Sequence, residues 1–178
     1  NGRHVKVFRN APITLRDLYY SHSSELDFIV YEDERYSYSE ILNLSKRLAN
    51  IMISEFNIKK GDRVGISMRN YPEWSISFIA ATSIGAIAVS FNALWGPKDL
   101  AFALNDCEPK LIFVDNERLL NLSQVHERPK TLEVVRVRSD DNTDISSHCW
   151  KALISTYQNT QLPIINMNAD DDATIIYT

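Results

Sequence analysis

Short apolar runs alternate with amphipathic stretches along most of this chain. Each run is apolar without polar alternation, which is typical of strands that are buried on both faces of a parallel sheet. Helical patterns separate the runs, so the order strand, helix, strand repeats. The strand candidates are residues 64–68, 86–91, 111–114, 132–137 and 173–178. The pattern predicts an α/β domain in which layered helices surround a largely parallel sheet.

The clearest unit is the stretch 61–92. It begins with the strand at 64–68 and continues with a mostly apolar helix over about residues 71–84. Gly85 ends the helix, and the strand at 86–91 follows. A crossover of this type joins parallel strands and is almost always right-handed.

Smaller elements are predicted ahead of this unit. Thr14 can cap a short helix that starts at Leu15. A strand at 28–31 can pair with residues 36–38 across a charged turn, as a hairpin.

Ser37 and Glu40 then form an S-x-x-E capping box, which marks the start of a helix. This helix runs to about Phe56. Its apolar residues recur at steps of three and four, as on one face of a helix. They are Ile41, Leu44, Leu48, Ile51, Met52 and Phe56.

Pro97 favours the first turn of another helix. Further short helices are predicted at about 117–123 and 149–157. Residues 138–147 have a loop-like composition, and residues 158–168 a linker-like one.

Composition fits a soluble globular protein, because 44% of the 178 residues are hydrophobic and 24% are charged. The formal net charge is −4 and basic residues are scattered, which gives no electrostatic basis for binding nucleic acid. No apolar run approaches the roughly 20 residues that cross a bilayer, so we expect no transmembrane segment. Cys107 and Cys149 form no C-x-x-C pair, and we expect reduced thiols in a cytoplasmic protein.

Motifs that would place a complete active site are absent from the sequence. Neither G-x-G-x-x-G nor G-x-x-x-x-G-K-[ST] occurs among its five glycines, so a phosphate cradle within these residues is not expected. None of the four histidines stands at a metal-ligand spacing, and we expect His22 to be structural. The acidic run 170–172 is expected to be solvated.

Three further side chains have both a structural and a functional interpretation. We expect Cys107 to lie in a turn as a bystander, since no histidine partner is evident. Trp74 is expected to be a core or interface anchor. Trp95 lies in the loop after a strand, where ligands often dock, but packing is the favoured interpretation.

Five segments in this order resemble the adenylate-forming enzymes, which include acyl-CoA synthetases, luciferases and the adenylation domains of nonribosomal peptide synthetases. The segments are YSYSEI, KKGDRV, RNYPEW, IGAIAVSFN and LIFVD. NALW followed by KDLAFAL is most similar to fatty-acid and related carboxylic-acid CoA ligases. The resemblance covers nearly the whole chain.

The resemblance implies an ATP-dependent acid–thiol ligase as the full-length parent. Such an enzyme activates a carboxylic acid, here expected to be a fatty acid, with Mg-ATP as an acyl-adenylate. It then transfers the acyl group to CoA. ATP, Mg²⁺ and CoA are thus the cofactors implied for the parent, and we expect none of them bound to the 178-residue chain alone.

The resemblance also implies where residues 1–178 lie in such an enzyme. The ending DDDATIIYT is similar to the strand that precedes the family's Ser/Thr/Gly-rich phosphate loop. We therefore expect an N-terminal subdomain that is truncated just before that loop and is inactive alone. Thr178, at the edge of the ATP loop, is the one candidate cofactor-binding residue, and no catalytic or metal-binding residue is expected. Residues 92–96 correspond to a loop near the CoA nucleotide in some relatives, but they contain no arginine.

Two other functions stay open at this point. One is a stand-alone α/β module that binds a partner through exposed apolar surface. The other is an adenylating ligase that transfers the acyl group to a carrier-protein thiol. Apolar surface that further subdomains would cover is also expected, and self-association of the chain is compatible with it.

Overall fold

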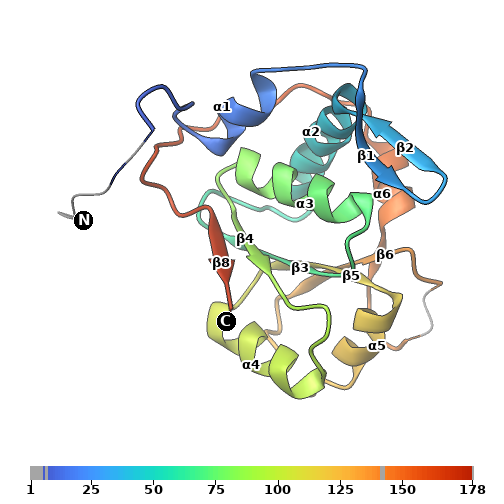
Figure 1. Ribbon diagram of the computed structural model, residues 1–178. Helices are drawn as coiled ribbons and strands as arrows, with labels where there is room; N and C mark the ends of the chain where they lie inside the picture. Colours follow the sequence, from blue (N-terminus) through green and yellow to red (C-terminus); the bar gives the residue numbers. More distant parts are fainter. Residues whose placement is uncertain (1–5, 7, 141–142, 178) are drawn as a thin grey trace.

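The computed structural model describes residue 6 and residues 8–140 and 143–177. Its centre is a six-stranded sheet with the order β7-β6-β5-β3-β4-β8, in which every neighbouring pair is parallel (Figure 1). The prediction of a largely parallel sheet is thus confirmed. The strands are β3 (Arg63–Ser67), β4 (Ile87–Ser90), β5 (Leu111–Asp115), β6 (Glu133–Val137), β7 (His148–Cys149) and β8 (Thr174–Ile176).

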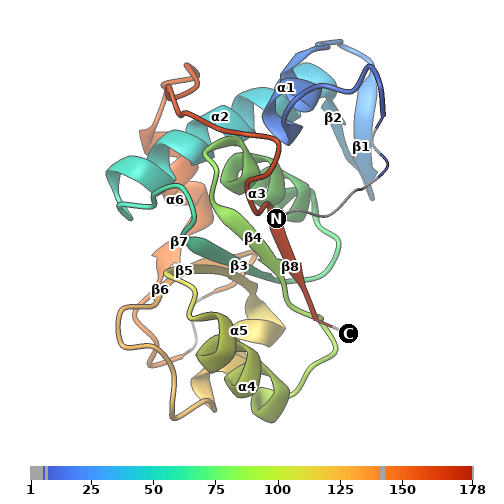
Figure 2. The same cartoon turned by 90° about the vertical axis from the view of Figure 1, so that its left-hand side faces the viewer.

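Helices cover both faces of this sheet. One layer contains α1 (Leu15–Tyr20), α2 (Tyr38–Ser54), α3 (Pro72–Ser83) and α6 (Trp150–Thr156). The opposite layer contains α4 (Pro97–Cys107) and α5 (Asn116–Ser123), as Figure 2 shows from the side. In the described part of the chain, no helix combines the length and the apolar character that crossing a membrane requires.

The apolar strands divide their side chains between the two layers. Along β5, Leu111 and Phe113 pack into the core below α2 and α3, whereas Ile112 and Val114 pack into the core above α4 and α5. All four are fully buried. This alternation explains why the strand is apolar at every position, as the sequence pattern predicted.

Local sequence signals begin and end several helices as predicted. Ser37 Oγ accepts the backbone N–H of Glu40, and the Glu40 carboxylate accepts the N–H of Ser37, which completes the capping box of α2. Thr14 caps α1 in the same way, with Asp17 as its reciprocal partner. Gly85 follows α3 at φ +71°, a left-handed conformation that glycine adopts without strain.

Two short segments differ from the sequence-based expectation. The hairpin is confirmed, but its strands are β1 (Asp27–Tyr31) and β2 (Glu34–Ser37), so the second strand begins earlier than predicted. His148 was expected to precede a helix that includes Cys149, whereas both residues form β7 and pair with β6. A two-residue strand is too short to show a period, so only its neighbour in the sheet reveals it.

Arg138 connects the hairpin to α3. Its guanidinium donates to Glu34 at 2.7 and 2.8 Å and to Glu73 at 3.0 Å. It also lies 5.1 Å from the ring centroids of Tyr31 and Tyr71. The hydrogen bonds from Arg138 lower the pKa of Glu34 to about 2. One side chain therefore joins three segments that are distant in sequence.

The outer face of the hairpin and α1 exposes apolar side chains. Leu26 is 73% exposed, Val30 59% and Ile13 71%, and the Phe28 ring stacks on Tyr38 near the surface. This agrees with the expectation of exposed apolar surface.

Gly65 in β3 offers a test of how tightly the sheet packs against α4. A Cβ atom there would lie 2.6 Å from Phe91 Cε2 and 2.9 Å from Ile112 Cγ1, and both of these side chains are buried. We expect Gly65→Ala to lower the free energy of unfolding by about 1–3 kcal/mol, because buried rings have no room to move aside. Urea unfolding measures the change.

Gly96→Ala is the matched control. A Cβ atom added at Gly96 would meet nothing within 4 Å, and the backbone there has φ −80°, which any residue adopts. Gly96 is the N-cap of α4, so alanine there should cost less than about 1 kcal/mol. Equal losses for the two variants would contradict the packing argument.

Candidate functional site at the carboxyl edge of the sheet

The parallel strands bring their carboxyl ends to one edge of the sheet. From β3 the chain leaves toward α3 on one face, whereas from the neighbouring strands β4 and β5 it leaves toward α4 and α5 on the other face. Ligands of open α/β sheets bind at such a topological switch point. The loops after β3, β4 and β5 therefore form the candidate site.

Asp115, the last residue of β5, joins two of these loops. Its Oδ2 atom accepts the backbone N–H of Arg69, in the loop after β3, at 2.9 Å. Its Oδ1 atom accepts the backbone N–H of Arg118 at 3.0 Å and so caps α5. The carboxylate is 4% exposed, and it fills the space between the loops leaving β3 and β5.

Arg118 adds the third loop to this arrangement. Its Nη1 atom lies 3.3 Å from Asp115 Oδ2 and 2.9 Å from Glu117 Oε2. Its Nε atom donates to the carbonyl of Ala93 at 2.7 Å, and its Nη2 atom donates to the same carbonyl. The side chain is 4% exposed, so this is a buried ion pair that protein oxygens surround.

We call residues 92–96, between β4 and α4, the Trp95 loop. Besides the bond from Arg118 to Ala93, Asn121 Nδ2 donates to the carbonyl of Trp95 at 3.2 Å. Both donors come from α5. Within the loop, the N–H groups of Leu94 and Trp95 donate to Asn92. Side chains of α5 therefore hold the middle of the loop against the sheet edge.

Trp95 packs into an aromatic cluster with Phe91 and Tyr177. The ring centroids of Trp95 and Tyr177 are 5.7 Å apart at an interplanar angle of 69°, and Phe91 stacks on Tyr177 at 6.3 Å. The Tyr177 hydroxyl donates to Asp106 at 2.7 Å. Burial raises the pKa of Tyr177, and the bond to Asp106 raises it further. The segment after β8 is thus held by a ring contact and a hydrogen bond.

The one residue predicted to bind cofactor, Thr178, lies outside the described residues. Trp95 and Trp74 both pack against other rings, as the favoured interpretation held, with Trp74 stacked on Phe78 at 5.4 Å. Cys107 was expected in a turn, which is wrong. It is the last residue of α4, it is buried, and burial raises the pKa of its thiol.

The acidic run 170–172 contains one ion pair at the surface. Asp171 pairs with Lys60 at 2.7 Å and accepts the N–H of Asn168. The pair fastens the segment before β8 to the turn before β3. Asp170 and Asp172 are exposed and Asp171 is 25% exposed, so the run is solvated as expected, with one surface ion pair that the sequence did not indicate.

Sequence reasoning missed Arg118. The available signal was an aspartate at a strand end followed three residues later by an arginine, a spacing that puts both side chains on one side of a helix start. The partner carbonyl of Ala93 is 25 positions away, and no sequence pattern indicates it.

Arg118 and Arg69, two cations at this edge, contact carboxylates of the same chain. The guanidinium of Arg118 already donates to Asp115, Glu117 and Ala93, and the exposed Arg69 lies 3.6 Å from Glu117. Over the described ranges, no three His, Cys, Asp or Glu side chains come together as a metal-binding group. The contacts of Asp115 and Arg118 therefore join the three loops at this edge of the sheet.

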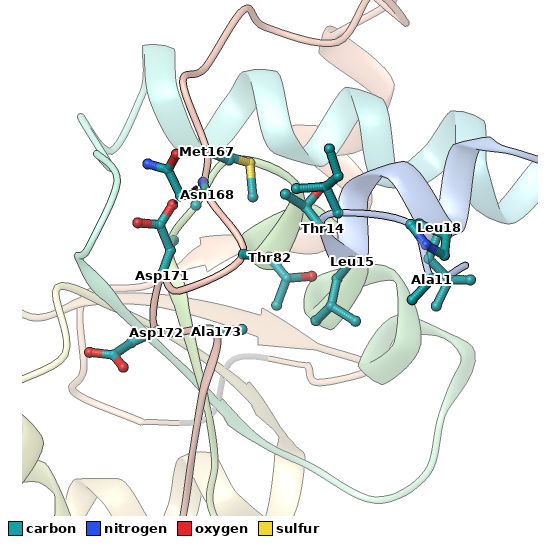
Figure 3. Close-up of a pocket in the computed structure, with 15 residues that line it drawn as sticks. Ala11, Thr14, Leu15, Leu18, Thr82, Met167, Asn168, Asp171, Asp172 and Ala173 are labelled. Atoms are coloured by element: carbon teal, nitrogen blue, oxygen red, sulfur yellow. Dashed lines mark hydrogen bonds between the residues drawn. The ribbon is translucent and has the colours of Figure 1, made fainter. Parts of the chain in front are cut away.

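A cavity of about 300 Å³ lies elsewhere, among α1, the end of α3 and the segment before β8 (Figure 3). Its walls include Leu15, Leu18 and Met167. The Thr82 hydroxyl at its wall donates to the carbonyl of Phe78 at 2.7 Å. Because Ala86 and Ala173 precede β4 and β8, the cavity lies at the amino edge of the sheet, away from the candidate site.

The family of AMP-binding enzymes matches residues 20–178. This chain belongs to that family. The resemblance to adenylate-forming enzymes is thus confirmed.

Individual relatives agree with this membership. This chain is 29% identical over 131 residues to 4-hydroxybutyrate–CoA ligase 2 of Metallosphaera sedula, a match that covers 73% of this chain and 23% of the relative. The fold of this chain is similar to that in the crystal structure of the anthranilate CoA ligase AuaEII in complex with anthranoyl-AMP. The TM-score is 0.84 at 19% identity, over 95% of this chain and 32% of that chain.

A second solved structure is the N-terminal domain of FACL13 from Mycobacterium tuberculosis. The TM-score is 0.75 at 22% identity, over 92% of this chain and 40% of that chain. The chain spans roughly a fifth to a quarter of the length of the curated relatives that it matches.

The buried ion pair predicts a large and specific loss of stability. Asp115→Ala leaves the Arg118 guanidinium without its buried counter-charge and removes the cap of α5. We expect the free energy of unfolding to fall by about 3–5 kcal/mol, since removing one partner of a buried ion pair is strongly unfavourable. Urea unfolding measures this loss.

Glu117→Gln is the control, because Glu117 contacts the same Nη1 atom but is 61% exposed. Its loss should stay within about 1 kcal/mol. A similar small loss for Asp115→Ala would show that the buried pair does not hold the loops together.

Proposed function

We propose that residues 1–178 form the N-terminal subdomain of an ATP-dependent acid–thiol ligase. The observation that carries this proposal is the family match over residues 20–178 in a chain that spans about a quarter of its relatives' length. In the proposed reaction, a carboxylate oxygen attacks the α-phosphorus of ATP, which yields acyl-AMP and pyrophosphate. A thiol then attacks the acyl carbon, and AMP leaves.

The contribution that we propose for this subdomain is to orient the chain that enters the ATP site. β8 lies parallel to β4, and Ala88 pairs with Thr174. Tyr177 is held by Trp95 and Asp106 at the carboxyl edge. We propose that Thr178 borders a phosphate-binding loop that follows it, because strand ends at this edge are where such loops form in α/β proteins.

The acid and the acceptor thiol are the finer parts of the proposal. The relatives compared above are named for 4-hydroxybutyrate and anthranilate, which are chemically unlike each other. We propose a carboxylic acid of the fatty-acid class and CoA as acceptor, following the resemblance of NALW and KDLAFAL to fatty-acid CoA ligases. Family membership favours a ligase over a stand-alone interaction module.

The complete protein that contains this chain should catalyse acid-dependent exchange between ATP and pyrophosphate. The assay uses a panel of acids from acetate to long-chain fatty acids, with anthranilate and 4-hydroxybutyrate included. Adding CoA should then yield an acyl-CoA with the same acid. If ATP–pyrophosphate exchange occurs but a thioester forms only when a carrier protein is added, the protein is the carrier-thiol ligase. If no acid supports ATP–pyrophosphate exchange, adenylation is refuted.

The 178-residue chain alone tests the proposed domain boundary. Calorimetric titration with ATP should show no saturable site tighter than about 1 mM, a free energy of about −4 kcal/mol. The reason is that Arg118 and Arg69 at its carboxyl edge already contact carboxylates of the same chain. A saturable site well below millimolar would mean that the phosphate site lies within residues 1–178.

A further inference from the structure

We propose that Arg118 is a positioning residue for the ATP site, acting through the Trp95 loop on Tyr177. The inference rests on the proposed function, because it takes the chain after Tyr177 to lead into the phosphate-binding loop. The observations that carry it are three successive contacts: Arg118 with the Ala93 carbonyl, Trp95 with Tyr177, and Tyr177 with Asp106.

The first contact needs the forked shape of a guanidinium. Nε and Nη2 of Arg118 both donate to the carbonyl of Ala93, whereas Nη1 faces Asp115. Arginine presents these donors in one rigid plane, and lysine carries a single nitrogen. A lysine at this position keeps the charge beside Asp115 but cannot hold both partners in the same geometry.

The Trp95 loop depends on this contact for its position. The N–H groups of Leu94 and Trp95 donate only within the loop, to Asn92, and the Leu94 side chain is 86% exposed. Among the described residues, the side chains that donate to loop carbonyls are those of Arg118 and Asn121, and at the end of the loop the carbonyl of Gly96 accepts the N–H of Leu100 in α4. Loss of the Arg118 fork therefore frees the middle of the loop.

Trp95 passes this positioning on to Tyr177. Its indole meets the Tyr177 ring edge-on, and Phe91 stacks on the same ring from the end of β4. Phe91 is buried beside the sheet, whereas Trp95 belongs to the loop. Trp95 is therefore the ring of this cluster that moves when the loop moves. When the loop moves, Tyr177 and the chain after it should shift by a fraction of the 5.7 Å that separates the Trp95 and Tyr177 ring centroids.

Misplacement on this scale changes substrate positioning more than it changes the fold. We expect Arg118→Lys in the complete protein to raise the KM for ATP in the exchange assay by about tenfold. The KM for the acid should stay within about twofold. Amide hydrogen exchange should become faster in peptides covering residues 91–97 and 172–178, and should be unchanged in peptides from α2.

Arg128→Met is the matched control. Nη1 of Arg128 also donates to backbone carbonyls, those of Leu122 and Val125, but at the far end of α5. It has no contact with the Trp95 loop among those described. This variant should leave both the KM for ATP and the rate of amide hydrogen exchange in residues 91–97 as in the wild type.

Arg118→Met tests the same point more severely, because it removes the charge as well as the fork. If it fails to fold, Arg118→Lys still decides the matter. The inference is overturned if Arg118→Lys leaves the exchange of residues 91–97 unchanged, or if Arg128→Met raises the KM for ATP equally. Absence of ATP–pyrophosphate exchange in the wild type would refute the proposed function instead, and hydrogen exchange would still report whether Arg118 holds the loop.

Discussion

The buried pair of Asp115 and Arg118 couples the three loops at the carboxyl edge of the sheet. A charged pair in the interior is stable only when further hydrogen bonds satisfy both groups, and here backbone groups of three loops supply them. The requirement works in both directions. The loops must approach closely to solvate the charges, and the charges then fix the distance between the loops.

Arg138 solves a similar problem at a more exposed place. It joins Glu34 in the hairpin to Glu73 in α3, and its side chain is 26% exposed. Water screens this cluster more than it screens Arg118, so its effect on stability should be smaller. The domain therefore has a buried ion pair beside the candidate site and a partly exposed one that holds the peripheral hairpin.

The sequence pattern predicted the sheet and most helices because these follow from local periods and caps. The capping box of Ser37 and the glycine after α3 are examples whose signals lie within a few residues. The candidate site was less predictable. Arg118 donates to a backbone carbonyl 25 positions away. Every residue has such an acceptor, so the residue type at position 93 does not indicate the contact. β7 was not predicted for a related reason, because only its pairing with β6 defines this two-residue strand.

The place of β8 in the sheet has a consequence for synthesis on the ribosome. β8 follows the other strands of this sheet along the described chain, and it covers the edge of β4, where Ala88 pairs with Thr174. The segments that complete the rest of the sheet emerge earlier. Until residues 174–176 leave the exit tunnel, β4 presents an open edge of the kind that pairs with other nascent chains. Newly made copies thus depend on the last described strand for protection of their central crossover.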